Sequence, residues 1–438
     1  MADERKAKDL TEAELAELLA TKRAARFRGS SFYEAELDNE VQKHRDGLLR
    51  SQRMFDEASQ TEGNAHKPCP KCNQLIRVTR KKVARTVTSV DGAAILRRNY
   101  HYCGGCKLGF FPLDVQLDLP DAGTTSALVT KFILDLGLHS TFEGAAQRFA
   151  LHHGAAISEN MVRLVVERAG RAATSDAFLA HRLRPPAVTV PALLLVAVDG
   201  SMLPTRGHDA WRETKLGMVV RAEHRSEGKA RALISEARFV ARMTGVATFA
   251  HDLTRLLSLE QAWACPTVAF LGDGAPWIWN MAQQICPNAV QIVDFMHAMG
   301  AAAKAVETLF IDDKIMLKVW TDTVAKYLKA GRVHDLVAQL EQCAFATRGR
   351  LRTAFATAAK YFNTNATRMR YDVFLRAGLP IGSGMIESAH RHVLQARMKL
   401  AGQHWDPVRA DRLAQLRAAQ ATCGPAKIYD AIFPRQAA

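Results

Sequence analysis

The sequence lacks long hydrophobic runs, has few cysteines for its length and shows no excess of acidic residues. Its longest apolar run covers residues 192–198, far short of the roughly 20 residues that cross a bilayer. The first residues contain no apolar stretch of the kind found in secretory signals. Eight cysteines among 438 residues are too few for a disulfide scaffold. These absences predict a cytoplasmic protein with reduced cysteines and no membrane partner.

Positive charge is abundant. Lysine and arginine number 59 against 44 aspartates and glutamates, which gives a formal net charge of +15. Such an excess favours a polyanionic partner, with nucleic acid as the first candidate; the alternative is a merely soluble basic protein. The apolar share of 48% excludes global disorder, and the length predicts roughly two to four domains.

Composition changes several times along the chain. The first segment has leucines at helical spacing among balanced charges, which predicts a helical arm that is either solvated or contacts DNA or a second subunit. A basic segment with short β-branched stretches follows, then helices, then alternating strands and helices of an α/β sheet, then helices alone. The predicted segments are 1–65, 66–120, 121–188, 189–300, 301–380 and a C-terminal helical part, 381–438.

Two Cys-x-x-Cys pairs predict a structural zinc site. Cys69 and Cys72 are followed after 30 residues by Cys103 and Cys106. Each pair supplies two thiolates from one tight turn, and four thiolates leave no open position for catalysis. The alternative is two coincidental pairs without metal. We expect the intervening segment to form a basic β-hairpin in a zinc ribbon.

Residues 140–168 suggest a helix-turn-helix. Two phenylalanines and two alanines share one face of a predicted helix that Ser140 or Thr141 is suited to cap. After a turn through Gly154, a second helix follows Ser158. The length and the small residues suit a DNA-binding pair with Arg163 toward DNA, although an ordinary pair of packed helices has the same pattern.

Three apolar, strand-like runs each end in an aspartate. These are Asp199, Asp273 and Asp294, and His297 follows the last by three residues. Aspartates from neighbouring strands are suited to bind Mg²⁺, and a pair of such ions supports phosphodiester chemistry. A single aspartate at a strand end is more commonly a helix cap or a turn residue. Asp294 competes with Asp273 for the second position, and a packed histidine is an equal interpretation of His297.

A third acidic element lies near the C-terminus. Glu387 follows a Gly-Ser-Gly turn in which Ser383 is suited to cap a helix, and His390 and Arg391 share its helical face. A carboxylate beside cations could serve a metal and a phosphate backbone together, whereas an ordinary surface pair would contribute little. Across the chain, the cations expected to contact DNA are Arg77, Arg80, Lys81, Lys82, Arg163, Arg391, Arg397 and Lys399.

These motifs resemble a known family. The Asp199-Gly and Asp273-Gly pairs and the Gly-Ser-Gly-Met-Ile-Glu387 box resemble the three acidic motifs of Mutator-related DDE transposases. The Asp294-Phe-Met-His297 element resembles the C/D-x-x-H signature of that superfamily, which favours Asp273 as the second acidic residue.

The upstream sequence is similar to one bacterial group. The run from Cys103-Gly-Gly-Cys106 into Gly109-Phe-Phe-Pro is similar to the N-terminal zinc motif of the Kra-type insertion sequences. The segment Trp211-Arg-Glu-Thr-Lys-Leu-Gly is also similar to the segment that follows the first acidic motif in that group. The resemblance covers residues 66–415.

The resemblance implies an RNase H-like catalytic core that carries Asp199 and Asp273, with a helical insertion before the helix of Glu387. It implies a transposase that binds terminal inverted repeats of double-stranded DNA, exposes a 3′-OH and joins it to target DNA. Two Mg²⁺ ions, or Mn²⁺, would be held by the three carboxylates, with no small-molecule substrate. A homodimer or larger assembly on nucleoid DNA is expected. The alternatives are an inactive, domesticated DNA-binding regulator and an RNase H-like nuclease without strand transfer.

Overall fold

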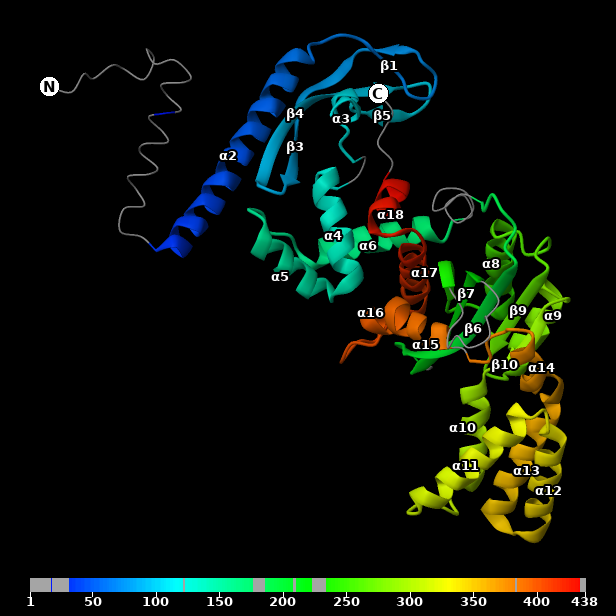
Figure 1. Cartoon of the computed structure of the whole chain (residues 1–438). Helices are drawn as coiled ribbons and strands as arrows, with labels where there is room; N and C mark the ends of the chain where they lie inside the picture. Colours follow the sequence, from blue (N-terminus) through cyan, green and yellow to red (C-terminus); the bar gives the residue numbers. More distant parts are fainter. Residues whose placement is uncertain are drawn as a thin grey trace. The chain divides into compact units, whose positions relative to one another are not determined.

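A computed structural model describes most of the chain (Figure 1). It covers residues 17, 31–120, 123–175, 186–207, 210–222, 234–382 and 384–433, with the side chains of 234–236 excepted. The fold is mixed α/β with a helical majority. It divides into two compact units: among the described residues, one holds those up to 133 and 143–159, and the other holds 134–142 and those from 160 to 433. Among the described helices, none is both long enough and apolar enough to cross a membrane.

The first unit begins with a long helix, α2 (Phe32–Thr61). Ser31 and Glu34 close its N-terminus in a reciprocal capping box. Phe55 is buried among apolar side chains of the neighbouring strands. The arm expected from the sequence is therefore a helix from residue 32 onward, and it packs against the ribbon. Except for Glu17, the first 30 residues of the expected arm lie outside the described residues.

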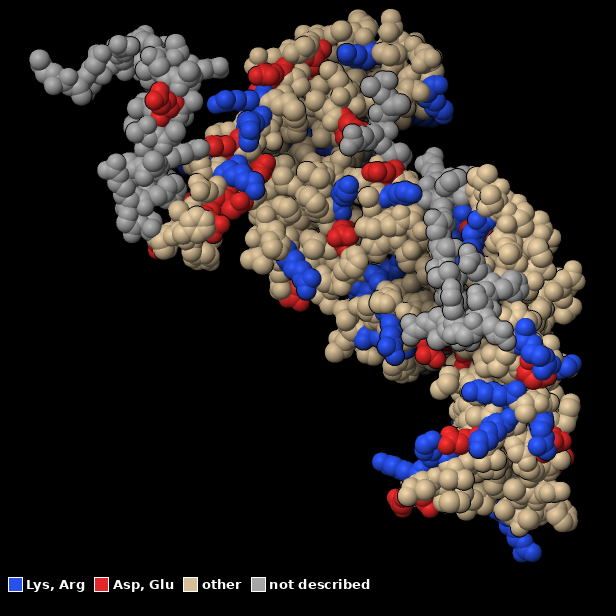
Figure 2. Space-filling view, in the orientation of Figure 1, with Lys and Arg blue, Asp and Glu red and all other residues tan. Residues whose placement is uncertain are grey.

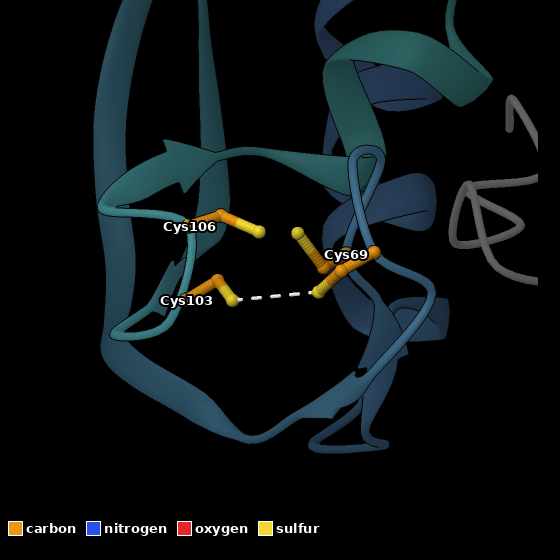
Figure 3. A group of neighbouring side chains, drawn as sticks. Cys69, Cys103 and Cys106 are labelled. Carbon is orange, nitrogen blue, oxygen red and sulfur yellow. Dashed lines mark hydrogen bonds between the residues drawn. The ribbon is translucent and has the colours of Figure 1, made fainter.

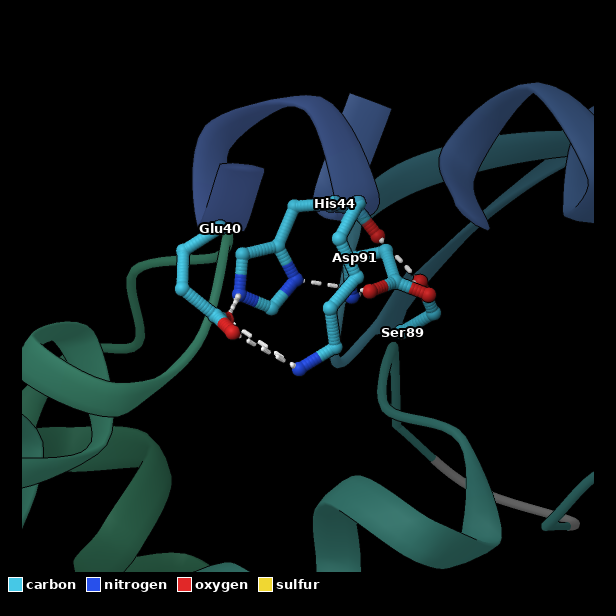
Figure 4. Close-up of polar contacts among 6 residues, drawn as sticks. Glu40, His44, Ser89 and Asp91 are labelled. Atoms are coloured by element: carbon cyan, nitrogen blue, oxygen red, sulfur yellow. Dashed lines mark hydrogen bonds and ion pairs between the residues drawn. The ribbon is translucent and has the colours of Figure 1, made fainter. Parts of the chain in front are cut away.

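Polar contacts also fasten α2 to the ribbon. The Nδ1 atom of His44 lies 2.7 Å from an Asp91 carboxylate oxygen in the turn between two strands (Figure 4). The Gln52 amide donates to the Ile95 carbonyl and accepts from the Ile95 N–H, at 3.0 and 2.8 Å. Gly47 permits this approach, because a Cβ there would overlap the Asp91 carboxylate.

The ribbon consists of two small antiparallel sheets. The hairpin expected from the sequence is formed by β3 (Val78–Ser89) and β4 (Gly92–Cys103). A bulge interrupts β3: the register shifts on both sides of Arg80, and Lys82 has a left-handed φ of 50°. The strands are β1 (Lys67–Pro68), β2 (Leu75–Ile76), β3 (Val78–Ser89), β4 (Gly92–Cys103) and β5 (Leu108–Phe110). The helices that follow are α3 (Pro112–Gln116), α4 (Ala127–His139) and α5 (Phe142–His152).

Both helices of the predicted helix-turn-helix are present. They are α5 and α6 (Glu159–Ala173), and Ala145 and Phe149 are fully buried as the pattern predicts. Because α5 belongs to the first unit and α6 to the second, the helix-turn-helix stays a prediction.

A five-stranded mixed sheet forms the centre of the second unit. Its order is β10-β9-β6-β7-β8, with β6, β9 and β10 mutually parallel and β7 antiparallel to both neighbours. Residues 193–198 of β6 are completely buried, which accounts for their unbroken apolar sequence. The strands are β6 (Leu193–Pro204), β7 (Trp211–Ala222), β8 (Ile234–Arg242), β9 (Thr267–Gly272) and β10 (Val290–Val293).

Helices pack on both faces of this sheet. Phe249 and Leu253 of α8 contact β7 at Gly217 on one face, and α15 contacts β6 and β7. Residues 301–380 contain helices and no strand, as expected. The helices are α8 (Val246–Leu259), α9 (Pro276–Ile285), α10 (Phe295–Val306), α11 (Lys314–Lys329), α12 (Val333–Ala346), α13 (Gly349–Thr364), a 3₁₀ turn (Ala366–Met369), α14 (Tyr371–Arg376), α15 (Gly384–Ala389), a π-helix (His390–Gln395), α16 (Ala396–Met398), α17 (Pro407–Cys423) and α18 (Pro425–Ile432).

Helix α17 closes the sheet at β8. The N–H groups of residues 239, 241 and 243 donate to side chains of Thr422, Gln415 and Asp411, at 2.9, 3.2 and 2.8 Å. The outward-facing donors of a terminal strand are thereby satisfied, so the edge is covered. Asp411 also accepts from the buried Arg242, which pairs with Asp252 as well.

We predict that Asp411→Ala destabilises the protein by about 3–5 kcal/mol, because it leaves a buried arginine and a backbone N–H without this partner. Denaturant unfolding would measure the loss. Asp335→Ala removes an exposed partner of Arg332 and should change stability by about 0–1 kcal/mol. Equal effects of the two variants would contradict the role assigned to α17.

Candidate functional site

The four cysteines of the ribbon form a cluster. Two of them come from the turn between β1 and β2, and two from the end of β4 and the turn that follows. Their sulfur atoms all lie within 4.8 Å of one another, and Figure 3 shows the side chains turned toward a common centre. Cys69 and Cys103 are fully buried. This geometry is compatible with a tetrahedral zinc ion.

The two cysteine turns share a backbone feature. Asn73 and Lys107, the residues directly after each pair, have left-handed φ angles of 58° and 52°. In the first turn, the Asn73 N–H donates to the Cys69 carbonyl at 2.9 Å. Each turn thus bends back sharply and presents its two sulfur atoms on the same side.

The electrostatics of the cluster favour a bound cation. The backbone N–H groups of Lys71 and Cys72 lower the pKa of Cys69 to about 7. Hydrogen bonding with the Cys72 thiol, together with burial, raises the pKa of Cys106 to about 12. Four thiolates are held together only around a positive charge, which a zinc ion at their centre would supply.

The parallel strands bring the predicted aspartates to one end of the sheet. Asp199 was expected to end its strand, but β6 continues to Pro204 alongside β7, so Asp199 lies within β6 just beyond its pairing with β9. Ala197 of β6 pairs with Leu271 of β9, so Asp199 and Asp273 each follow a paired residue by two positions. Val293 of β10 pairs with Gly272 of β9, so Asp294 and Asp273 each come one position after a paired residue. The three aspartates are therefore at one level, with Asp273 on the middle strand about 4.8 Å from each neighbour along the backbone and the outer two about twice as far apart.

Asp199 and Asp273 are both half-buried. The Gly200 N–H donates to Asp199 Oδ1 at 2.7 Å. The Ala275 N–H donates to Asp273 Oδ1 at 2.8 Å, and the Tyr361 hydroxyl donates to the Asp273 carbonyl at 3.0 Å. Gly274 has a φ of 100° and leaves room for the Tyr361 ring.

Asp294 has a different environment. It is 1% exposed and caps α10, with its Oδ1 accepting from the His297 N–H at 2.8 Å and lying 3.1 Å from the His297 ring. This hydrogen bond, with the negative charges of Asp294, Asp199 and Asp273, raises the pKa of His297. Asp294 thus holds the His297 ring in place within range of the charges of the other two aspartates.

Glu387 is exposed on α15, which contacts β6 and β7. The preceding turn reaches the start of α10, because the Phe295 N–H donates to the Ile381 carbonyl at 2.8 Å. Ser383 lies outside the described residues. Within the described ranges, the cysteine cluster is the only group of three or more His, Cys, Asp or Glu residues whose metal-ligating atoms all lie within 4.8 Å of one another. The carboxylate oxygens of Glu387, Asp199 and Asp273 therefore do not all lie within 4.8 Å of one another in this structure.

The predicted DNA-contacting cations have unequal exposure. Arg77, Arg80, Lys81 and Lys82 on the ribbon are exposed, as are Arg391 and Lys399. Arg163 is half-buried and pairs with Glu167 at 2.8 Å. On the face drawn in Figure 2, basic side chains appear on the ribbon and, with acidic ones among them, on α2 and the helices of residues 301–380.

Arg397 departs from the sequence expectation. It is 1% exposed, donates to the Gly137 carbonyl at 2.9 Å and lies over the rings of both Phe142 and Trp405. Burial lowers the pKa of its guanidinium to about 10. Arg397 is therefore a packing residue in this structure and not a surface contact for DNA.

Two residues that support the site lie outside every motif of the sequence. Arg417 of α17 is buried and donates to the carbonyls of His392 and Val393. Tyr361 comes from the helical segment and holds the Asp273 turn. Neither lies in a motif, and both act through contacts distant in the sequence. Only an alignment of related sequences could have indicated them.

We predict that the purified protein contains about one zinc ion per chain. Cys103→Ser should remove it and loosen the ribbon, because three thiolates hold zinc less tightly than four. Metal analysis by mass spectrometry and limited proteolysis would measure both effects. Cys343→Ser on α12 is the control and should retain full zinc content; zinc retained by Cys103→Ser would contradict the assignment.

No protein-family model matches the chain, and no curated protein matches it.

Proposed function

We propose that the chain is a DNA transposase of the DDE type that cleaves element ends and joins them to target DNA. The observation that carries this proposal is the register of the parallel strands, which aligns Asp199 with Asp273 at one edge of the sheet. The sequence motifs around these residues resemble the acidic motifs of such enzymes.

The fold is consistent with an RNase H-like core. A mixed sheet has helices on both faces, Asp273 follows β9, and Asp199 lies on the neighbouring parallel strand β6 just beyond its pairing with β9. The helices of residues 301–380 occupy the interval in which the resemblance implies an insertion. The segment after that interval returns to the sheet, where α15 contacts β6 and β7.

The residues at this edge fit magnesium. They offer hard carboxylate oxygens, the preferred ligands of that ion, and their combined negative charge is felt by His297. Two ions about 3.5–4 Å apart can be held by ligands that lie farther apart than the ligands of a single ion. A pair of ions therefore suits a Glu387 carboxylate that lies some distance from the two aspartates. The chemistry that bound magnesium or manganese supplies is activation of an attacking hydroxyl and stabilisation of a leaving oxygen.

The protein's own residues would prepare this site. Backbone N–H groups orient the Asp199 and Asp273 carboxylates. Tyr361 holds the turn of Asp273 in place. Phosphate groups of the DNA would be held by exposed cations, of which the β3 bulge presents three in a row, Arg80, Lys81 and Lys82.

We predict that the triple change Arg80, Lys81 and Lys82 to alanine weakens DNA binding about tenfold or more at moderate salt. Each lost phosphate contact should reduce the salt dependence of log K by about 0.9. Fluorescence anisotropy with duplex DNA from the flanks of the coding region would measure both quantities. Arg50→Ala, an exposed cation on α2, is the control; an unchanged salt slope in the triple variant would exclude the bulge as a contact.

We predict that the protein cleaves flanking duplex DNA in Mg²⁺ and joins the new 3′-OH to a plasmid. Asp199→Asn, Asp273→Asn and Glu387→Gln should each reduce both steps at least about 100-fold, because each removes a charged ligand, while DNA binding persists. Gel analysis of labelled strands would measure the products. Glu341→Gln, at an exposed acid on α12, should retain activity.

The rival functions give different results. Binding that is indifferent to Mg²⁺, with no cleavage of any end, would indicate a DNA-binding regulator. Cleavage without joining would indicate a nuclease. Full activity in Asp199→Asn would reject the proposed site.

A further inference from the structure

His390 has an unusual position for a polar residue. It follows Glu387 by one helical turn, is 3% exposed, and its Nε2 lies 3.2 Å from Oδ2 of Asp199. Neither ring nitrogen has an aligned hydrogen bond to the rest of the described chain. A buried polar ring without such a partner is costly, so a purely structural role would be better served by an apolar side chain.

The backbone around His390 is also irregular. A π-helix begins at this residue and runs to Gln395, and such wide turns occur frequently at functional sites. Arg417 of α17 stabilises the turn, because it donates to the carbonyls of His392 and Val393. A buried cation from a different helix thus supports the π-helix that carries the ring.

We propose that His390 is a positioning residue for Asp199, and that its Nε2–H donates to Oδ2 when a divalent cation is bound. The Gly200 N–H already fixes Oδ1 from the other side at 2.7 Å. Two donors define the plane of the carboxylate and direct its remaining lone pairs at the cation. Hydrogen bonds of this kind to a ligating carboxylate typically change metal affinity 10–100-fold.

This inference rests on the proposed metal site and connects two of its parts. His390 belongs to the segment that also carries Glu387, so its contact with Asp199 ties that segment to β6. A change at His390 should therefore alter metal binding even though His390 is not itself a ligand.

The test is a titration of the full-length protein with Mn²⁺ alone, in which free Mn²⁺ is followed by electron paramagnetic resonance. His390→Phe fills the same space without a donor and should weaken Mn²⁺ binding about 10–100-fold. His390→Gln retains an N–H donor and should bind within a few-fold of wild type. His392→Phe, at an exposed histidine of the same π-helix, should bind as wild type does. Thermal unfolding would establish that each variant is folded.

Three results would overturn the proposal. Wild-type affinity in His390→Phe would show that the donor is irrelevant, and equal weakening in His390→Gln and His390→Phe would show that only the ring's shape matters. If His390→Phe does not fold, His390→Met, which also lacks a donor, replaces it with the same criterion. The third result concerns the metal site itself: Mn²⁺ binding that Asp199→Asn leaves unchanged would reject the proposed site, and His390 with it.

Discussion

Helix α17 supplies the constraint on which the second unit depends. Three of its side chains satisfy the outward N–H groups of β8, and Arg417 holds the carbonyls of the π-helix. A single helix therefore covers the open edge of the sheet and fixes the segment that follows Glu387. An uncovered edge would invite association with another strand, and an unsupported π-helix would leave buried carbonyls without partners.

The second constraint is the parallel pairing of β6 with β9 and β10. Asp199 and Asp273 are 74 positions apart in the sequence, yet the register places both at the same level of the sheet. Asp294 reaches that level too, but its burial and its bonds to His297 give it an orienting role. Burial and hydrogen bonding thus separate three aspartates that look equivalent in the sequence.

Local patterns in the sequence predicted much of the fold. The spacing of the cysteine pairs predicted the four-cysteine cluster, since each pair needs only one tight turn. The absence of β-branched runs in residues 301–380 correctly indicated helices alone. Each apolar run that ended in an aspartate is a strand, because buried parallel strands carry unbroken apolar sequence. These features depend on neighbouring residues and can be recognised without knowledge of tertiary contacts.

Long-range contacts could not be predicted in this way. Arg397 looked like a surface cation, but its partner, the Gly137 carbonyl, is 260 positions away. The packing of α2 on the ribbon depends on His44 and Asp91, 47 positions apart. His390 was recognised on the face of Glu387, but its contact with Asp199 depends on a π-helix that no local pattern indicates.

The most direct test of the central claim is anomalous diffraction at the manganese edge from crystals grown with Mn²⁺ and DNA. The account predicts ions bound by the carboxylates of Asp199, Asp273 and Glu387 together, whereas manganese absent from that edge of the sheet would contradict it.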